Sequence, residues 1–195
     1  MPRRETPLCA GEHYHFYNRG NNRERIFYER ENYLFFLRRI RKHLLPVLDV
    51  VAYCLMPTHY HLLVKINQTS EVLKTSEVSR AMMRFSVSYT KAMNKRYDRV
   101  GTLFQGAFQA LHVDQNDYLV HLSRYIHLNP VMAGLVKRAE DWEPSSYREY
   151  VGLRDGTLPK TEIVLSQFPS LGAYREFVES FVPDERERIA HLLFE

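Results

Sequence analysis

Apolar and polar positions along the chain follow two spacings, one typical of strands and one typical of helices. Short runs rich in β-branched and aromatic residues predict three strands, at residues 13–18, 47–55 and 59–66. The segment Met56-Pro57-Thr58 predicts a short turn between the last two. A fourth strand is expected over residues 102–113, with a bend at Gly106.

Longer segments with apolar residues three or four positions apart predict helices at 30–44, 79–97 and 115–128. The polar residues 69–78 are expected to lead into the second helix. The third helix is expected to stop at Asn129, because the residue before a proline is disfavoured in the α region. From about residue 140 the chain is expected to be less ordered, with two short helices near 171–181 and 184–193.

The element order β-α-β-β-α-β-α predicts an α+β domain with a mostly antiparallel sheet. The length of 195 residues suits one domain with a small appendage. No run of about 18 apolar residues occurs, so no membrane span is expected. The N-terminus lacks the apolar core of a signal peptide, and the two cysteines, Cys9 and Cys54, have no CxxC spacing. We therefore expect a cytoplasmic protein with free thiols.

Charge is unevenly distributed along the chain. Residues 1–131 hold 19 Lys and Arg against 11 Asp and Glu, whereas residues 132–195 hold 8 against 12. A basic body with an acidic tail favours a polyanionic partner for the body. Six basic residues in and just after the second predicted helix could bind phosphates: Arg80, Arg84, Lys91, Lys95, Arg96 and Arg99. Tyr97, Phe104 and Phe108 could stack on bases, although an ordinary solvated helix face has a similar pattern.

The run HYH at residues 59–61 places His59 and His61 on one face of a predicted strand, because strand side chains alternate between faces. Two imidazoles on a rigid strand can bind a divalent metal, although a hydrogen-bonded surface pair has the same spacing. The run HYH at residues 13–15 repeats the pattern. The setting favours residues 59–61, which continue into a deeply apolar strand, whereas residues 13–15 lie near a frayed terminus.

Tyr125 and Asn129 lie four residues apart in the third predicted helix, so they share one face. A phenol that loses its proton can attack phosphorus, and an amide oxygen is a hard metal ligand. A half-buried core tyrosine would show the same spacing. Tyr118, two turns earlier, is a rival nucleophile.

Two runs, in this order, resemble those of a known family. MPTHYHLLV, which contains His59 and His61, resembles the histidine–hydrophobic–histidine signature of the HUH endonucleases. LSRYIHLNPVMAGLV, which contains Tyr125 and Asn129, resembles the nucleophile helix of the REP-associated tyrosine transposases, relatives of the single-tyrosine insertion-sequence transposases. The supporting runs are YNRGNNRERIF, NKRYDRVGTLFQGAF and DWEPSSYREYVG, and the resemblance covers residues 12–152.

The resemblance implies an RRM-like or ferredoxin-like antiparallel sheet flanked by helices. We assign residues 1–152 to this domain and residues 153–195 to a small helical C-terminal extension that matches no motif. The implied nucleophile is Tyr125, the implied ligands of Mg²⁺ or Mn²⁺ are His59, His61 and Asn129, and residues 13–15 match only the first strand. Further DNA contacts are expected at Arg19, Asn21, Phe104 and Gln105. Ala107 and Gln109 stand where many relatives have basic residues, which weakens one expected DNA contact.

The implied activity is that of a metal-dependent endonuclease and strand transferase, acting on single-stranded DNA hairpins such as repetitive extragenic palindromes. Attack by the tyrosine would leave a 3′-hydroxyl and a 5′-phosphotyrosine. We expect a nucleoid-associated monomer or homodimer. One alternative is a domesticated DNA-binding regulator that does not cut, which the intact set of site residues disfavours. Another is a different HUH nickase, such as a relaxase or replication initiator, and the lack of a large appendage disfavours a full initiator.

Overall fold

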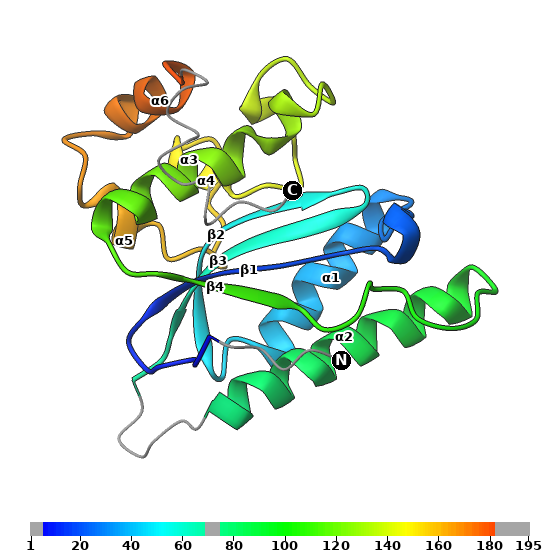
Figure 1. Ribbon diagram of the computed structural model, residues 1–195. Helices are drawn as coiled ribbons and strands as arrows, with labels where there is room; N and C mark the ends of the chain where they lie inside the picture. Colours follow the sequence, from blue (N-terminus) through cyan, green and yellow to red (C-terminus); the bar gives the residue numbers. More distant parts are fainter. Residues whose placement is uncertain (1–5, 69–74, 182–195) are drawn as a thin grey trace.

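The computed structural model describes residues 6–68 and 75–181. Within them, four strands form one antiparallel sheet in the order β2-β3-β1-β4. The strands are β1 (His13–Arg19), β2 (Leu48–Met56), β3 (His59–Ile66) and β4 (Gln109–Val113). Helices α1 (Arg30–His43) and α2 (Thr75–Arg96) lie on one side of the sheet, and α3 (Asn116–Met132) lies on the other (Figure 1). The predicted α+β class and ferredoxin-like sheet are confirmed.

The first face of the sheet packs against α1 and α2. Side-chain alternation directs Tyr14 and Phe16 of β1 and Leu62 of β3 to this side, where they belong to the larger core. Phe36 of α1 and Phe85 of α2 meet there with ring centroids 4.8 Å apart. Burial of these large apolar side chains is the main force that holds the two helices on the sheet.

The second face of the sheet packs against α3 and forms a separate core. Ala52 and Cys54 of β2 and Leu63 of β3 point to this side. Leu122 and Ile126 of α3 are fully buried against them. The same strands therefore supply both cores, with alternate residues going to each side.

Helix α3 continues past the position where the sequence predicted its end. Pro130 lies inside α3, which runs on to Met132. Pro130 has no N–H to donate to the preceding turn, yet the helix continues, and the N–H of Ala133 donates to Asn129 O at 2.9 Å. The prediction of a stop at Asn129 was therefore wrong, and Asn129 remains helical, one turn beyond Tyr125.

The fourth strand is shorter than predicted, because β4 begins only at Gln109. The segment before it contributes one isolated bridge, between Gly20 and Phe104. Gly101 and Gly106 have φ of 82° and 81°, a left-handed backbone that glycine adopts without steric cost. Gly106 interrupts the extended backbone inside the predicted segment and Gly101 turns the chain just before it, so the first part of the predicted strand does not form.

Residues 133–181, the described chain after α3, pack on that helix, so the prediction of a less ordered tail was wrong for these residues. They contain η2 (Ala139–Asp141), α4 (Tyr147–Tyr150), α5 (Glu162–Leu165) and α6 (Leu171–Glu179). Tyr147, Tyr150 and Tyr174 are buried in the same core as α3, so the described part of the predicted extension shares a core with the main domain. Helix α6 corresponds to the predicted helix at 171–181. The predicted helix at 184–193 lies outside the described residues, as do residues 69–74 before α2.

Two further observations concern the class of protein. In the part of the chain that the structure describes, no helix has both the length and the apolar character needed to cross a bilayer. Cys9 is exposed and Cys54 is buried, and both thiols are free, as predicted.

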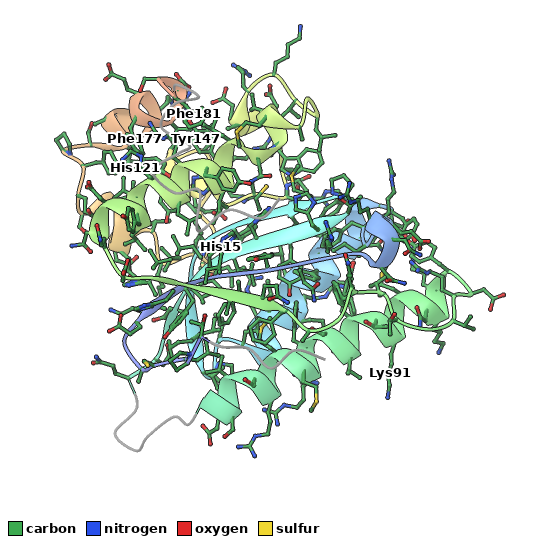
Figure 2. All side chains as sticks on the ribbon, viewed as in Figure 1. His15, Lys91, His121, Tyr147, Phe177 and Phe181 are labelled. Atoms are coloured by element: carbon green, nitrogen blue, oxygen red, sulfur yellow. The ribbon has the colours of Figure 1, made fainter. Side chains whose placement is uncertain are left out.

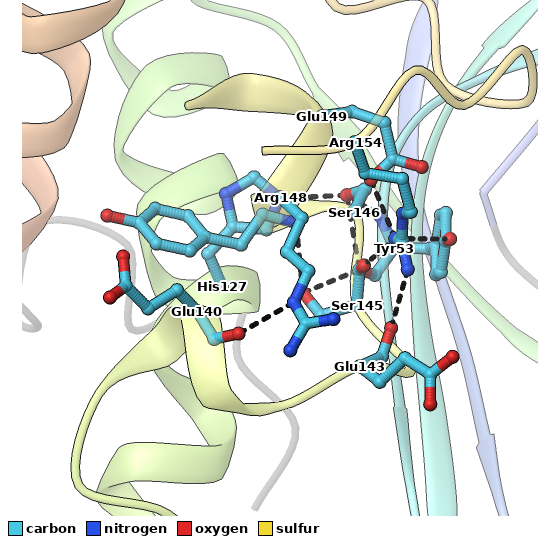
Figure 3. A network of polar contacts seen from close by, with 10 residues as sticks. Tyr53, His127, Glu140, Glu143, Ser145, Ser146, Arg148, Glu149 and Arg154 are labelled. Atoms are coloured by element: carbon cyan, nitrogen blue, oxygen red, sulfur yellow. Dashed lines mark hydrogen bonds and ion pairs between the residues drawn. The ribbon is translucent and has the colours of Figure 1, made fainter. Parts of the chain in front are cut away.

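A buried polar network joins α3 to β2 through the segment that follows α3 (Figure 3). His127 Nε2 lies 2.8 Å from Ser146 Oγ, and His127 Nδ1 lies 2.8 Å from the Tyr174 hydroxyl. Ser146 Oγ accepts from Tyr53 N–H at 2.8 Å and donates to Tyr53 O at 3.2 Å. Arg154 donates to the Tyr53 hydroxyl at 3.2 Å. Burial lowers the pKa of His127 to about 3, so the ring is neutral and each nitrogen has a hydroxyl partner.

Replacement of Ser146 tests this network. Ser146→Ala is expected to lower the free energy of unfolding by about 1–3 kcal/mol, because Tyr53 N–H and His127 Nε2 lose a buried partner. Urea denaturation followed by circular dichroism measures the change. Ser166→Ala, at an exposed position, is the matched control and should stay within about 0.5 kcal/mol of wild type. Equal stability of Ser146→Ala and wild type would show that the network does not stabilise the docking of α3.

Candidate active site and metal centre

His59 and His61 lie next to each other on the α3 side of β3. Their ring centroids are 5.0 Å apart and their planes are nearly perpendicular, at 87°. Alternation along the strand places Tyr60, which stands between them, in the opposite core. Thr58 Oγ1 lies 3.0 Å from His59 Nδ1, so coordination of a metal by His59 would use Nε2.

Both imidazoles are neutral at pH 7. Burial lowers the pKa of His59 to about 4, and a hydrogen bond with Asn129 acts in the opposite direction. Burial also lowers the pKa of His61 well below its ordinary value, and the neighbouring His15 and His59 lower it further. The neutral imidazole is the form that binds metals, so neither ring has to lose a proton before it can coordinate a cation.

Tyr125 reaches this histidine pair from α3. Its ring centroid lies 5.9 Å from that of His61, with the two planes at 82°. Asn129, one turn later on the same helix, hydrogen-bonds His59, and its Nδ2 donates to Tyr125 O at 3.4 Å. The structure thus brings together the four residues that the sequence assigned to one site.

The rival tyrosine, Tyr118, lies two turns of α3 before Tyr125. Tyr118 precedes Tyr125 by seven residues on α3, which corresponds to about 10 Å along the helix axis. Tyr125 is 5% exposed and packs in the core between α3 and the sheet. The position of the two rings along α3 favours Tyr125 as the group that acts with His59 and His61.

The side chains at the site fit a divalent metal. Among the described residues there is no cluster of three or more His, Cys, Asp or Glu suited to a metal ion. The side-chain oxygen of Asn129, which hydrogen-bonds His59, is a further donor that could bind a cation held by His59 and His61. Imidazole nitrogens favour transition ions, and amide and phosphate oxygens suit Mg²⁺ or Mn²⁺.

The first HYH run has a different setting from the one predicted. Strand β1 is not at a frayed end, because it pairs with β3 on one side and β4 on the other. His15 is fully buried, and its Nε2 lies 2.9 Å from His61 Nδ1. The interpretation that residues 13–15 serve only the first strand was therefore incomplete, because it missed the contact between His15 and the candidate metal pair.

A small pocket of about 160 Å³ lies on the same side of the sheet, lined by Tyr17, Asn18, Arg19, Gln105 and Gln109. Arg19 pairs in register with His59, and its guanidinium contacts the Gln105 side chain. Two of the predicted DNA contacts, Arg19 and Gln105, therefore lie beside the histidine pair. Tyr17, whose ring centroid is 6.5 Å from that of His61, was missed. Its alternation with His15 along β1 is the signal that could have found it.

The predicted basic helix lies on the opposite side of the sheet from His59 and His61. Lys91 points away from the sheet (Figure 2), and Arg84 and Lys95 are exposed. The other three basic residues form ion pairs: Arg80 with Glu77, Arg96 with Glu29, and Arg99 with Glu24. DNA bound at His59 and His61 could contact α2 only with nucleotides that lie far from the histidine pair.

Two residues predicted to stack on bases belong to the core. Phe104 is 6% exposed, and its ring centroid lies 6.0 Å from that of Tyr60. Phe108 is 7% exposed, and its ring centroid lies 4.9 Å from that of Phe16. These rings pack against other aromatic rings and have almost no exposed surface, which disfavours base stacking at these two positions. Asn21 lies in the short 3-10 helix η1 (Asn21–Arg23), where its N–H donates to Leu103 O at 2.9 Å.

Comparisons with known proteins bear on the same region of the chain. The family model described as "Transposase IS200 like" matches residues 10–129. A Haemophilus influenzae protein named "Putative REP-associated tyrosine transposase" is 29% identical over 108 residues, which are 53% of this chain and 61% of that protein. The chain thus spans less than two thirds of that relative's length. A solved structure of a REP-associated tyrosine transposase bound to a REP hairpin shares the fold, with a TM-score of 0.62 and 17% identity over 82% of this chain and 98% of that one.

Proposed function

Because this chain belongs to the IS200-like transposase family, we propose that it cuts and rejoins single-stranded DNA with Tyr125 as the nucleophile. The observation that carries the proposal is the distance of 5.9 Å between the ring centroids of Tyr125 and His61. His61 lies on the sheet face that also holds His59. A phenol and two neutral metal ligands on adjoining elements form a constellation suited to attack on a phosphodiester.

In the proposed reaction the Tyr125 oxygen attacks the scissile phosphorus while the phenol proton is lost to solvent. The bond from phosphorus to the 3′ oxygen breaks, and that oxygen takes up a proton. The products are a free 3′-hydroxyl and a 5′-phosphotyrosine. Since the new bond is itself a phosphodiester, a later 3′-hydroxyl can attack it and join two strands.

We propose that His59, His61 and Asn129 hold Mg²⁺ or Mn²⁺. Such an ion would supply Lewis-acid stabilisation of the charge that develops on the scissile phosphate. The residues of the chain supply the positioning: β3 is an inner strand, so its imidazoles are held by pairing on both sides. Helix α3 is fixed by the second core and by the His127 contacts, which hold Tyr125 at the metal site.

The proposed substrate is single-stranded DNA folded as a hairpin, because the solved structure that shares this fold is bound to a REP hairpin. Arg19 and Gln105, beside His59, would contact the nucleotides next to the scissile phosphate. Three exposed basic residues of α2 would contact a more distant part of the hairpin: Arg84, Lys91 and Lys95. The acting unit is a monomer or a homodimer.

The nucleophile is tested by removing one oxygen atom. Tyr125→Phe should lose the covalent protein–DNA adduct and keep wild-type affinity for a hairpin oligonucleotide, because only the attacking oxygen is removed. A denaturing gel with Mn²⁺ measures the adduct, and fluorescence anisotropy measures binding. Tyr118→Phe is the matched control and should form the adduct as wild type does. An adduct in Tyr125→Phe would contradict the assignment, and hairpin binding by wild type without any adduct would favour the non-cutting regulator.

The metal ligands are tested by titration with Mn²⁺. His59→Ala should weaken Mn²⁺ binding by at least about 100-fold and abolish Mn²⁺-dependent cutting, because one of two imidazole ligands is lost. Isothermal titration calorimetry gives the affinity. His112→Ala, an exposed histidine on β4 that contacts Glu12, is the control and should bind Mn²⁺ as wild type does. Unchanged affinity in His59→Ala would remove His59 from the site.

The path of the DNA is tested with a short oligonucleotide that spans only the cleavage site. Arg19→Ala should weaken its binding by about 1–3 kcal/mol, because Arg19 lies beside His59. Lys91→Ala should leave it unchanged, because Lys91 lies on the opposite side of the sheet. Fluorescence anisotropy at one fixed salt concentration compares the two. A larger loss in Lys91→Ala would place the cleaved strand on the α2 side instead.

A further inference from the structure

His15 is a third histidine in direct contact with the candidate metal pair. It lies on β1, is fully buried, and its Nε2 is 2.9 Å from His61 Nδ1. The two rings are stacked, with centroids 5.1 Å apart and planes inclined by 23°. Pairing of β1 with β3 fixes this placement, because Tyr17 lies opposite His61 and His15 opposite Leu63, which makes His15 the diagonal neighbour of His61.

The contact determines which nitrogen of His61 can face a metal. A neutral imidazole carries one proton, and the nitrogen that binds a metal must be the one without it. His15 occupies the Nδ1 side of His61, so coordination has to use Nε2, with the proton on Nδ1. A hydrogen bond from His61 Nδ1–H to His15 Nε2 favours that tautomer, whereas the other tautomer would place a proton on the coordinating nitrogen.

We propose that His15 is a positioning residue that holds His61 in the Nδ1–H tautomer, with its Nε2 lone pair directed to the metal. The proposal rests on the metal role given to His61 under the proposed function. Metal-binding histidines commonly donate their second nitrogen to a carboxylate or a backbone carbonyl, and loss of such a partner costs about 10- to 100-fold in metal affinity. In this chain the acceptor would be the imidazole of His15 on the neighbouring strand.

Three variants separate the hydrogen bond from the packing of the ring. His15→Phe keeps an aromatic ring against His61 and removes the acceptor. His15→Gln keeps an acceptor near the position of Nε2. His13→Phe is the matched control, because it makes the same change on the same face of β1, two residues away, where the strand pairs with Lys65 and Val113.

The test has two readouts that do not depend on DNA cleavage. Calorimetry with Mn²⁺ alone should show affinity lowered about 10- to 100-fold in His15→Phe, largely restored in His15→Gln, and unchanged in His13→Phe. Nitrogen-15 NMR of the metal-free wild type should show His61 protonated on Nδ1, and this tautomer should be lost in His15→Phe.

Two results would overturn the proposal. One is wild-type Mn²⁺ affinity in folded His15→Phe, or an equal loss in His15→Phe and His15→Gln, which would assign the effect to packing. The other is a wild-type His61 protonated on Nε2, a measurement that needs no variant to fold. Failure of the proposed function is distinguishable, because it appears as wild type without a DNA adduct, whatever the state of His61.

Discussion

The packing of α3 across β2 and β3 is the contact on which the candidate site depends. Neither element carries the chemistry alone: β3 holds His59 and His61, and α3 holds Tyr125 and Asn129. Apolar burial brings the helix to the sheet, but apolar contact has little directional preference. The polar contacts of His127, which reach β2 through Ser146, add the direction that sets where Tyr125 lies along the strand.

The two-sided sheet makes the site sensitive to strand register. His61 faces α3, while its neighbours in the chain, Tyr60 and Leu62, fill the core under α1 and α2. A shift of one residue in β3 would bury both histidines among the aromatic rings under α1 and α2 and turn Tyr60 and Leu62 to the α3 side. The large core under α1 and α2 therefore also fixes the position of the histidine pair, because it sets the register of β3.

Local pattern was enough to predict the main elements and the histidine pair, because alternation along β3 is a property of neighbouring residues. The sequence did not indicate that His15 touches His61, since this follows from how two distant strands pair. Charge counting found the basic residues of α2 without showing that they lie across the sheet from the site. Tyr147 and Tyr150 were missed as core because α4 has only four residues, too few to show helical spacing over a useful length. The end of α3 was mispredicted because the residue before a proline is disfavoured in the α region, whereas Asn129 and Pro130 both lie inside α3.

The proposed reaction requires that one tyrosine, on α3 beside His61, becomes bonded to DNA. Tandem mass spectrometry of a trypsin-digested protein–oligonucleotide complex tests it directly, because cleavage after Arg19 and Arg124 places Tyr17, Tyr118 and Tyr125 in three different peptides. The account predicts a nucleotide on Tyr125, at the start of the peptide that runs to Lys137. A nucleotide on Tyr118 or Tyr17 would contradict it.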